Sequence, residues 1–291
     1  SSTVIAKQTG YLAGAVKQGG SYFVYANVAD SGNPPSGVST VKADESAVTS
    51  GQTSVSLTAG SYSVGGVSYN YRSALQTAPN PLAAGGKTYT ITSTDVLSYS
   101  RLQTGYAVTV DNTVPAATNV STGNAGGGTH GLAEIGDTIT FTFSEQIDPQ
   151  SILAGWTGAS TPVVMELIDG GCAVLFCTND SFKIYNAAYS ATLPLGVVDL
   201  ATGGYYGCAG IGLLCSHTAT NFGSSGTAST MVASTNTITI TLGTNTGGNG
   251  AFHTVGSNSD MVWNSDNTPY DAAGNAASGN NFTETDNDYE F

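Results

Sequence analysis

Carboxylate and amide side chains occur in several turn-like stretches, and they are the residues of this chain that could bind a metal ion. Asp111 follows a short apolar stretch, Glu145 and Asp148 stand three residues apart, and Asp271 and Asn275 frame Asp-Ala-Ala-Gly-Asn. Carboxylate and amide oxygens are hard ligands that suit Ca²⁺. We therefore take Asp111, Glu145, Asp148, Asp271 and Asn275 as candidate calcium ligands.

Turn capping is the competing interpretation of the same residues. Asp and Asn side chains bond to the backbone of their own turn without any metal. The sequence has no EF-hand loop or other fixed ligand spacing that would require an ion. Calcium is therefore the one candidate cofactor, and both interpretations stay open at this point.

Catalytic residues are not arranged in any pattern that indicates an enzyme. The three histidines, His130, His217 and His253, lie in stretches rich in Gly, Ser or Thr, and no nucleophile elbow accompanies them. Glu134, Glu145 and Glu166 show no spacing that predicts a carboxylate pair of the glycosidase kind. We expect a protein without enzymatic activity.

The four cysteines all lie in the second half of the chain. No CxxC pair and no histidine at ligand spacing accompanies them, which disfavours a zinc site. Two disulfides formed in an oxidising compartment are the better interpretation, and three connectivities are open. We favour the two local loops, Cys172–Cys177 and Cys208–Cys215, over crossed pairing.

Composition and charge exclude some classes of partner. The chain of 291 residues has 7 Lys and Arg against 20 Asp and Glu, and its net charge is −13. Nucleic acids and anionic membranes are unsuitable partners, because both require clustered basic residues. No apolar run is long enough to span a bilayer. Hydrophobic residues make up 40% of the chain, which predicts a folded rather than a disordered protein.

Short alternating stretches separated by Gly, Pro and Asn turns run through the chain, and no sustained helical period appears. Both halves are therefore predicted to be all-β, with a short helical turn after Pro149. The first half suggests strands over 22–28, 38–43, 53–58, 67–72, 87–92 and 106–110. The second half suggests strands over 137–143, 163–168, 173–176, 181–185, 197–200, 229–233, 236–242 and 261–263.

Three segments resemble bacterial immunoglobulin-like repeats. They are YAVTVDNTVP at 106–115, GDTITFTFSEQIDP at 136–149 and DAAGNAAS at 271–278. The resemblance implies two tandem immunoglobulin-like β-sandwich domains. The first would span 1–115 and carry an N-terminal arm, and the second, larger domain would span 116–291 with cysteine-bearing loop insertions. Such repeats are common in secreted and cell-surface proteins, which implies an extracellular, bacterial cell-surface location.

Two functions are compatible with these features. The first is a structural surface protein that assembles with other copies of itself into a layer (S-layer) or filament, with residues 1–20 serving either as a plain first strand or as an arm that adds to a neighbour's sheet. The alternative is an adhesin or glycan-binding module, for which an exposed Trp156 could stack on a sugar ring. Trp263 is expected in the core instead.

Overall fold

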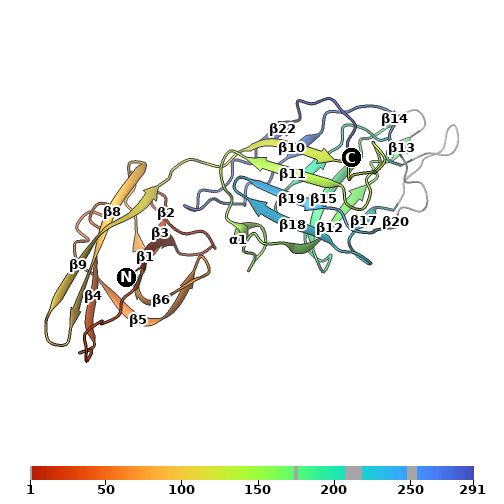
Figure 1. Cartoon of the computed structure of the whole chain (residues 1–291). Helices are drawn as coiled ribbons and strands as arrows, with labels where there is room; N and C mark the ends of the chain where they lie inside the picture. The colour runs from red at the N-terminus through yellow and green to blue at the C-terminus, as the bar shows by residue number, and fades with distance from the viewer. Residues whose placement is uncertain (1, 174–175, 207–217, 248–253) are drawn as a thin grey trace. The chain divides into compact units, whose positions relative to one another are not determined.

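The chain is an all-β protein whose strands form two sandwich-like or barrel-like bodies. The computed structural model describes residues 2–173, 176–206, 218–247 and 254–291 (Figure 1). The first unit comprises Ser1–Val114 together with Tyr270–Ala276, and the second comprises Pro115–Pro269 and Ala277–Phe291. The chain therefore passes between the units three times. Within the described residues, the short helix α1 (Pro149–Ile152) is the one α-helix.

Nine strands form the sheet of the first unit. They are β1 (Ser2–Lys7), β2 (Ala15–Val16), β3 (Ser21–Asn27), β4 (Val38–Asp44), β5 (Val55–Val64), β6 (Val67–Ser73), β7 (Gln76–Thr77), β8 (Gly85–Asp95) and β9 (Ser100–Val110). Their order is β1-β3-β6-β5-β4-β8-β9-β2, and β7 pairs with β3. Every pairing is antiparallel except that of β2 with β9.

Backbone bonds at Gly14 connect the two ends of this sheet. The N–H of Gly14 donates to the carbonyl oxygen of Ile5 at 2.8 Å, and the carbonyl oxygen of Gly14 accepts from the N–H of Thr109 at 2.9 Å. The first unit is thus nearly closed, which leaves few unpaired edge groups. Buried and exposed side chains alternate along its strands as the sequence predicts, and on β9 the buried ones include Val108 and Val110.

The N-terminal segment is an integral strand, so the plain first strand is confirmed and the N-terminal arm that adds to a neighbour's sheet is wrong. Strand β1 pairs with β3 from Ser2↔Asn27 to Lys7↔Tyr22. Ile5 and Ala6 are both fully buried. The alternation of this segment is hidden by its many Ala and Gly residues, which explains why the sequence left both interpretations open.

Eleven strands form the main sheet of the second unit. They are β10 (Ala117–Gly123), β11 (Thr138–Phe143), β12 (Thr161–Ile168), β15 (Ser181–Asn186), β16 (Val197–Asp199), β17 (Thr220–Phe222), β18 (Ser229–Ser234), β19 (Thr237–Thr241), β20 (Asn245–Gly247), β21 (Val262–Asn264) and β22 (Asn281–Thr283). Their order is β10-β11-β19-β18-β12-β15-β16-β21-β22, and β17 bridges β12 and β20.

Trp263 lies at the centre of the second unit's core. Its ring centroid is 5.0 Å from that of Phe141 and 5.0 Å from that of Phe143, and its indole N–H donates to the carbonyl oxygen of Leu195 at 2.6 Å. This confirms the expectation that Trp263 is a core residue. Trp156 is also buried, at 5% exposure, and donates to the carbonyl oxygen of Ala159. The expectation that Trp156 is exposed is therefore wrong.

Two further segments differ from the sequence-based expectation. Ala173 and Phe176, the ends of the strand expected over 173–176, belong to two different strands, β13 (Cys172–Ala173) and β14 (Phe176–Cys177), which pair with each other in a separate ladder. Residues 117–123 form β10, a strand that the sequence analysis did not predict. Bonding to the strongly alternating β11 explains this strand, since pairing can override weak local preference.

The cysteine ladder bears on the disulfides predicted from the sequence. Cys172 and Cys177 stand directly opposite each other in the β13–β14 register. No disulfide is found in the described part of the chain. The side chains of Cys172 and Cys177 lie outside that part. Cys208 and Cys215 lie outside the described residues. Both disulfides therefore remain predictions.

None of the helices in the described ranges is both long enough and apolar enough to cross a membrane.

Strand β1 gives a direct test of the first unit. Replacement of the buried Ile5 by alanine is expected to destabilise this unit by about 2–5 kcal/mol, because it removes core contacts and leaves a cavity. Ser56→Ala on the exposed face of β5 is the matched control and should change the free energy of unfolding by less than about 0.5 kcal/mol. Equilibrium denaturation followed by circular dichroism measures both. Equal effects would contradict the assignment of β1 to the core.

Candidate functional site

The loop Tyr270–Ala276 holds two of the candidate calcium ligands and belongs to the first unit. Sequence analysis assigned this segment to the close of the second domain, and the structure corrects that assignment. Asp271 is 1% exposed. Its Oδ1 accepts backbone N–H bonds from Ala273 at 2.8 Å, Gly274 at 2.6 Å and Asn275 at 2.8 Å. A single carboxylate oxygen therefore organises the whole turn.

The amide of Asn275 completes this turn. Its Nδ2 donates to Oδ2 of Asp271 at 2.8 Å and to the carbonyl oxygen of Asp111 at 3.0 Å. Gly274 has φ +94°, a conformation that favours glycine and lets three successive N–H groups converge on Asp271. The spacing Asp-Ala-Ala-Gly-Asn is thus explained by backbone geometry.

Two lysines bind the carbonyl oxygens of the same loop. Lys7 Nζ donates to the carbonyl oxygen of Ala272 at 3.0 Å, and Lys17 Nζ donates to that of Gly274 at 2.6 Å. Lys7 also lies 5.5 Å from the centroid of the Tyr270 ring, within the range of a cation–π contact. The loop is held to β1 and to the segment after β2 by these charge-assisted bonds.

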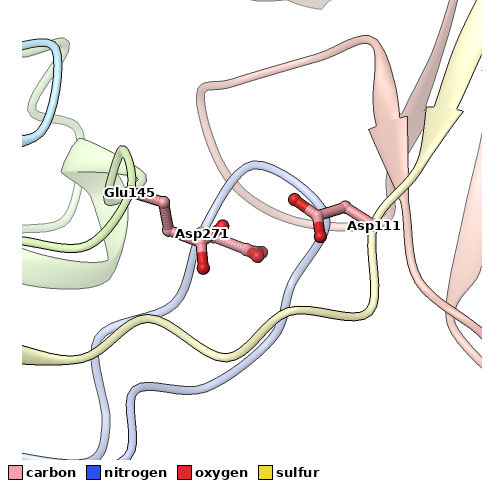
Figure 2. Close-up of side chains that lie close together, drawn as sticks. All are labelled: Asp111, Glu145 and Asp271. Atoms are coloured by element: carbon pink, nitrogen blue, oxygen red, sulfur yellow. The ribbon is translucent and has the colours of Figure 1, made fainter. Parts of the chain in front are cut away.

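Asp111 lies just after β9 and faces this loop. Figure 2 shows the carboxylates of Asp111 and Asp271 pointing into the same space, and one oxygen of each lies within 4.8 Å of the other. Asp111 Oδ1 also accepts the N–H of Thr113 at 2.9 Å. The structure thus brings together Asp111, Asp271 and Asn275, but protein donors already satisfy both oxygens of Asp271. This geometry favours turn capping, and calcium at these residues stays a prediction.

Glu145 and Asp148 belong to the second unit and lie in the turn between β11 and α1. Asp148 is fully buried and is the N-cap of α1, where its side chain accepts the N–H of Gln150 at 2.9 Å. Its backbone carbonyl accepts both the N–H and the hydroxyl of Ser151. Glu145, drawn in Figure 2 as well, is half-buried. Helix capping accounts for Asp148 without a metal.

A second group of carboxylates, which sequence analysis did not select, lies within the second unit. Glu284, Asp288 and Glu290 each present an oxygen within 4.8 Å of the other two. Glu290 is fully buried, Glu284 is 7% exposed and Asp288 is exposed. The sequence signal was an acidic run near the end of the chain, but which of its members turn inward depends on tertiary packing.

The histidines and Glu166 do not form a catalytic group in the part of the chain that the structure describes. His130 is exposed, whereas His217 and His253 lie outside the described residues. Glu166 accepts hydrogen bonds from the hydroxyls of Tyr185 and Tyr189. These contacts give Glu166 a structural role on the face of β12.

The tip of the β8–β9 hairpin is the most exposed apolar feature of the first unit. Val96, Leu97, Tyr99 and Leu102 are between 61% and 75% exposed. We call these four residues the hairpin tip. Apolar side chains grouped in this way on a surface often mark a site of contact with another molecule.

A polar hollow of about 580 Å³ lies beside the hairpin tip. Its lining includes Asp30, Asn70, Asp95, Tyr99 and Arg101. One aromatic ring and several hydrogen-bonding side chains are a suitable lining for a polar ligand.

Comparisons with protein-family models, with curated proteins and with solved structures find no match for this chain. Inferences about its function therefore depend on the residues and the geometry described above.

The turn around Asp271 can be tested against the metal interpretation. Asp271→Ala should destabilise the first unit by about 2–3 kcal/mol, because three backbone N–H groups, two of them buried, and the Asn275 amide lose their acceptor. Asp111→Ala, which removes one backbone bond at a half-buried residue, should cost less than about 1 kcal/mol. Each variant's loss of unfolding free energy should be the same in calcium and in EGTA. Loss of the Asp271 effect in EGTA would instead show that an ion holds the loop.

Proposed function

We propose that this chain is a structural subunit of an extracellular assembly, a surface layer or filament, and that its partner is another copy of itself. In this proposal its two β bodies are immunoglobulin-like sandwich domains, the protein is located at a bacterial cell surface, and it has no enzymatic role. The observation that carries the proposal is the hairpin tip. Its four large apolar side chains would be a liability for solubility on an isolated protein, whereas a neighbouring subunit would bury them.

The distribution of charge favours a second copy as the occupant of this surface. Six of the seven basic residues and five of the 20 acidic residues precede Pro115, so the acidic excess is carried by the rest of the chain. Arg101 is exposed and directly precedes Leu102 of the hairpin tip. An apolar surface with an exposed Arg, on a first unit whose six basic and six acidic residues balance, can approach the acidic second unit of the next subunit without like-charge repulsion. Such a head-to-tail contact is heterologous and can repeat into a filament or layer.

A glycan-binding or adhesive function is the second candidate, and the hollow beside the hairpin tip favours it. The ring of Tyr99 could stack on a sugar, and Asp30, Asn70 and Arg101 could bond its hydroxyls. Trp156 no longer supports this candidate, because it is buried.

The hairpin tip gives the test of assembly. The double variant Leu97→Asp/Tyr99→Ser should abolish large particles in light scattering and negative-stain imaging, because it places a charge and a polar group in the proposed contact. Leu75→Asp, an exposed apolar residue of the first unit outside the hairpin, is the matched control and should leave assembly intact. Thermal unfolding should show both variants folded.

A monodisperse wild-type chain of about 29 kDa at all concentrations would overturn the assembly proposal. It would move the glycan-binding candidate to first place. Equal loss of particles in the Leu75→Asp control would show that the hairpin tip is not the specific contact.

A further inference from the structure

The carboxylates of Glu284, Asp288 and Glu290 converge within the second unit, near the end of the chain. Glu284 follows β22, and its N–H donates to the carbonyl oxygen of Met261 at 2.9 Å. Asp288 pairs with Ser259 through an isolated antiparallel bridge. Backbone bonds to the segment just before β21 therefore place both residues.

Packing of the last two residues directs Glu290 inward. Phe291 is buried, with its ring 6.4 Å from that of Phe182 and 6.1 Å from that of Tyr205. The hydroxyl of Tyr205 donates to the carbonyl oxygen of Glu290 at 2.7 Å, and Thr122 Oγ1 accepts the N–H of Phe291 at 3.0 Å. The Glu290 side chain is thus held inside the unit by contacts on both sides.

Two of the carboxylate oxygens in this group have no donor from another described residue. Glu290 Oε2 accepts the hydroxyl of Thr122 at 2.9 Å, but Glu290 Oε1 and Glu284 Oε2 are buried without such a donor, and the two carboxyl groups also contact each other. An unpartnered buried carboxylate is strongly destabilising when it is ionised. Burial, together with the neighbouring carboxylates, raises the pKa of Glu290 to about 9 and that of Glu284 to about 7.

Basic side chains cannot supply the missing compensation. Lys183 is the only Lys or Arg after Pro115 in the sequence, and its strand position is directly opposite Glu166. Other buried carboxylates of the second unit are compensated by backbone donors. Asp137, for example, accepts N–H bonds from Ala125 and Glu134 at 2.7 and 2.6 Å.

A lone buried carboxyl in the first unit provides a useful contrast. Glu45 is fully buried, and the hydroxyl of Tyr22 is the side-chain group that interacts with its carboxyl. Burial raises its pKa to about 7, so a single proton neutralises it. The group in the second unit differs, because three carboxylates share one space and one of them, Asp288, is open to solvent. One shared proton leaves the remaining charges close together.

We propose that Glu284, Asp288 and Glu290 bind one divalent cation, and that Ca²⁺ is the suitable ion. The ligands are all hard carboxylate oxygens, and the exposed side at Asp288 leaves room for water to complete the 6–8 ligands of calcium. Two ligands at about 2.4 Å from one ion lie at most about 4.8 Å apart. The observed separations fall within that limit. The ion would fasten residues 284–291 to the second unit.

Calcium binding at this site is tested by titration calorimetry and thermal unfolding of the full chain after treatment with EGTA. The wild type should bind Ca²⁺ and unfold at a higher temperature with it. Glu290→Gln should weaken binding at this site at least tenfold, because Gln keeps the shape of the side chain but loses its charge. Asp286→Asn, at an exposed position outside the group, is the matched control and should bind as the wild type does.

The pH dependence of binding gives a second readout. Metal ligands must be deprotonated to bind, so calcium affinity should rise with pH, and Glu290→Gln should reduce that rise. If Glu290→Gln fails to fold, Asp288→Asn at the exposed ligand replaces it and should also weaken binding.

Identical calcium isotherms and thermal shifts for the wild type, Glu290→Gln and Asp288→Asn would overturn the proposal. A wild type that binds no calcium, with Glu290→Gln as stable as the wild type, would also overturn it. In that case the two glutamates share a proton instead. Asp111 and Asp271 remain intact in all these variants, so calcium bound there contributes equally to every titration.

Discussion

Scarcity of basic residues is the constraint on which much of this structure depends. With one Lys or Arg after Pro115, the second unit has almost no cations of its own to pair with its buried carboxylates. Backbone N–H groups take that role. Asp180 accepts the N–H of Gly170 and of Tyr205, each at 3.0 Å, and so connects two loops that are far apart in sequence. Short strands joined by long connections can be ordered in this way, because each buried Asp satisfies donors that the loops would otherwise leave unpaired.

The same constraint connects the two proposals. An acidic unit that lacks internal cations presents a negative field, which suits both a divalent ion and a neighbouring subunit with exposed basic and apolar residues. Glu284 and Glu290 depart from this backbone compensation, since they each retain a buried oxygen without a donor among the described residues. Their position beside Phe291 means that neutralisation of the group would also stabilise the packing of the last residues.

Strong alternation made parts of the fold predictable from sequence. The Thr-Ile-Thr-Phe-Thr-Phe stretch is β11. The first stretch of the first unit ends at Val114, one residue before the domain boundary expected at residue 115. Other features depend on contacts between distant residues. The loop at Asp271 joins the first unit because Lys7 and Lys17 bind its carbonyl oxygens. Trp156 is buried although its Gly-rich neighbours suggested an exposed turn.

The candidate sites show the same division between local and distant information. Turn capping by Asp148 and Asp271 could be predicted, because a side chain that bonds to its own turn leaves a local signature. The inward orientation of Glu290 could not, since it follows from the packing of Phe291 against Phe182 and Tyr205.

Anomalous X-ray diffraction from crystals of the full chain grown with calcium tests most directly whether an external cation compensates the buried carboxylates. The account predicts an anomalous difference peak about 2.3–2.6 Å from oxygens of Glu284, Asp288 and Glu290. An empty site, with the two glutamate carboxyls in direct contact through a hydrogen bond, would contradict it.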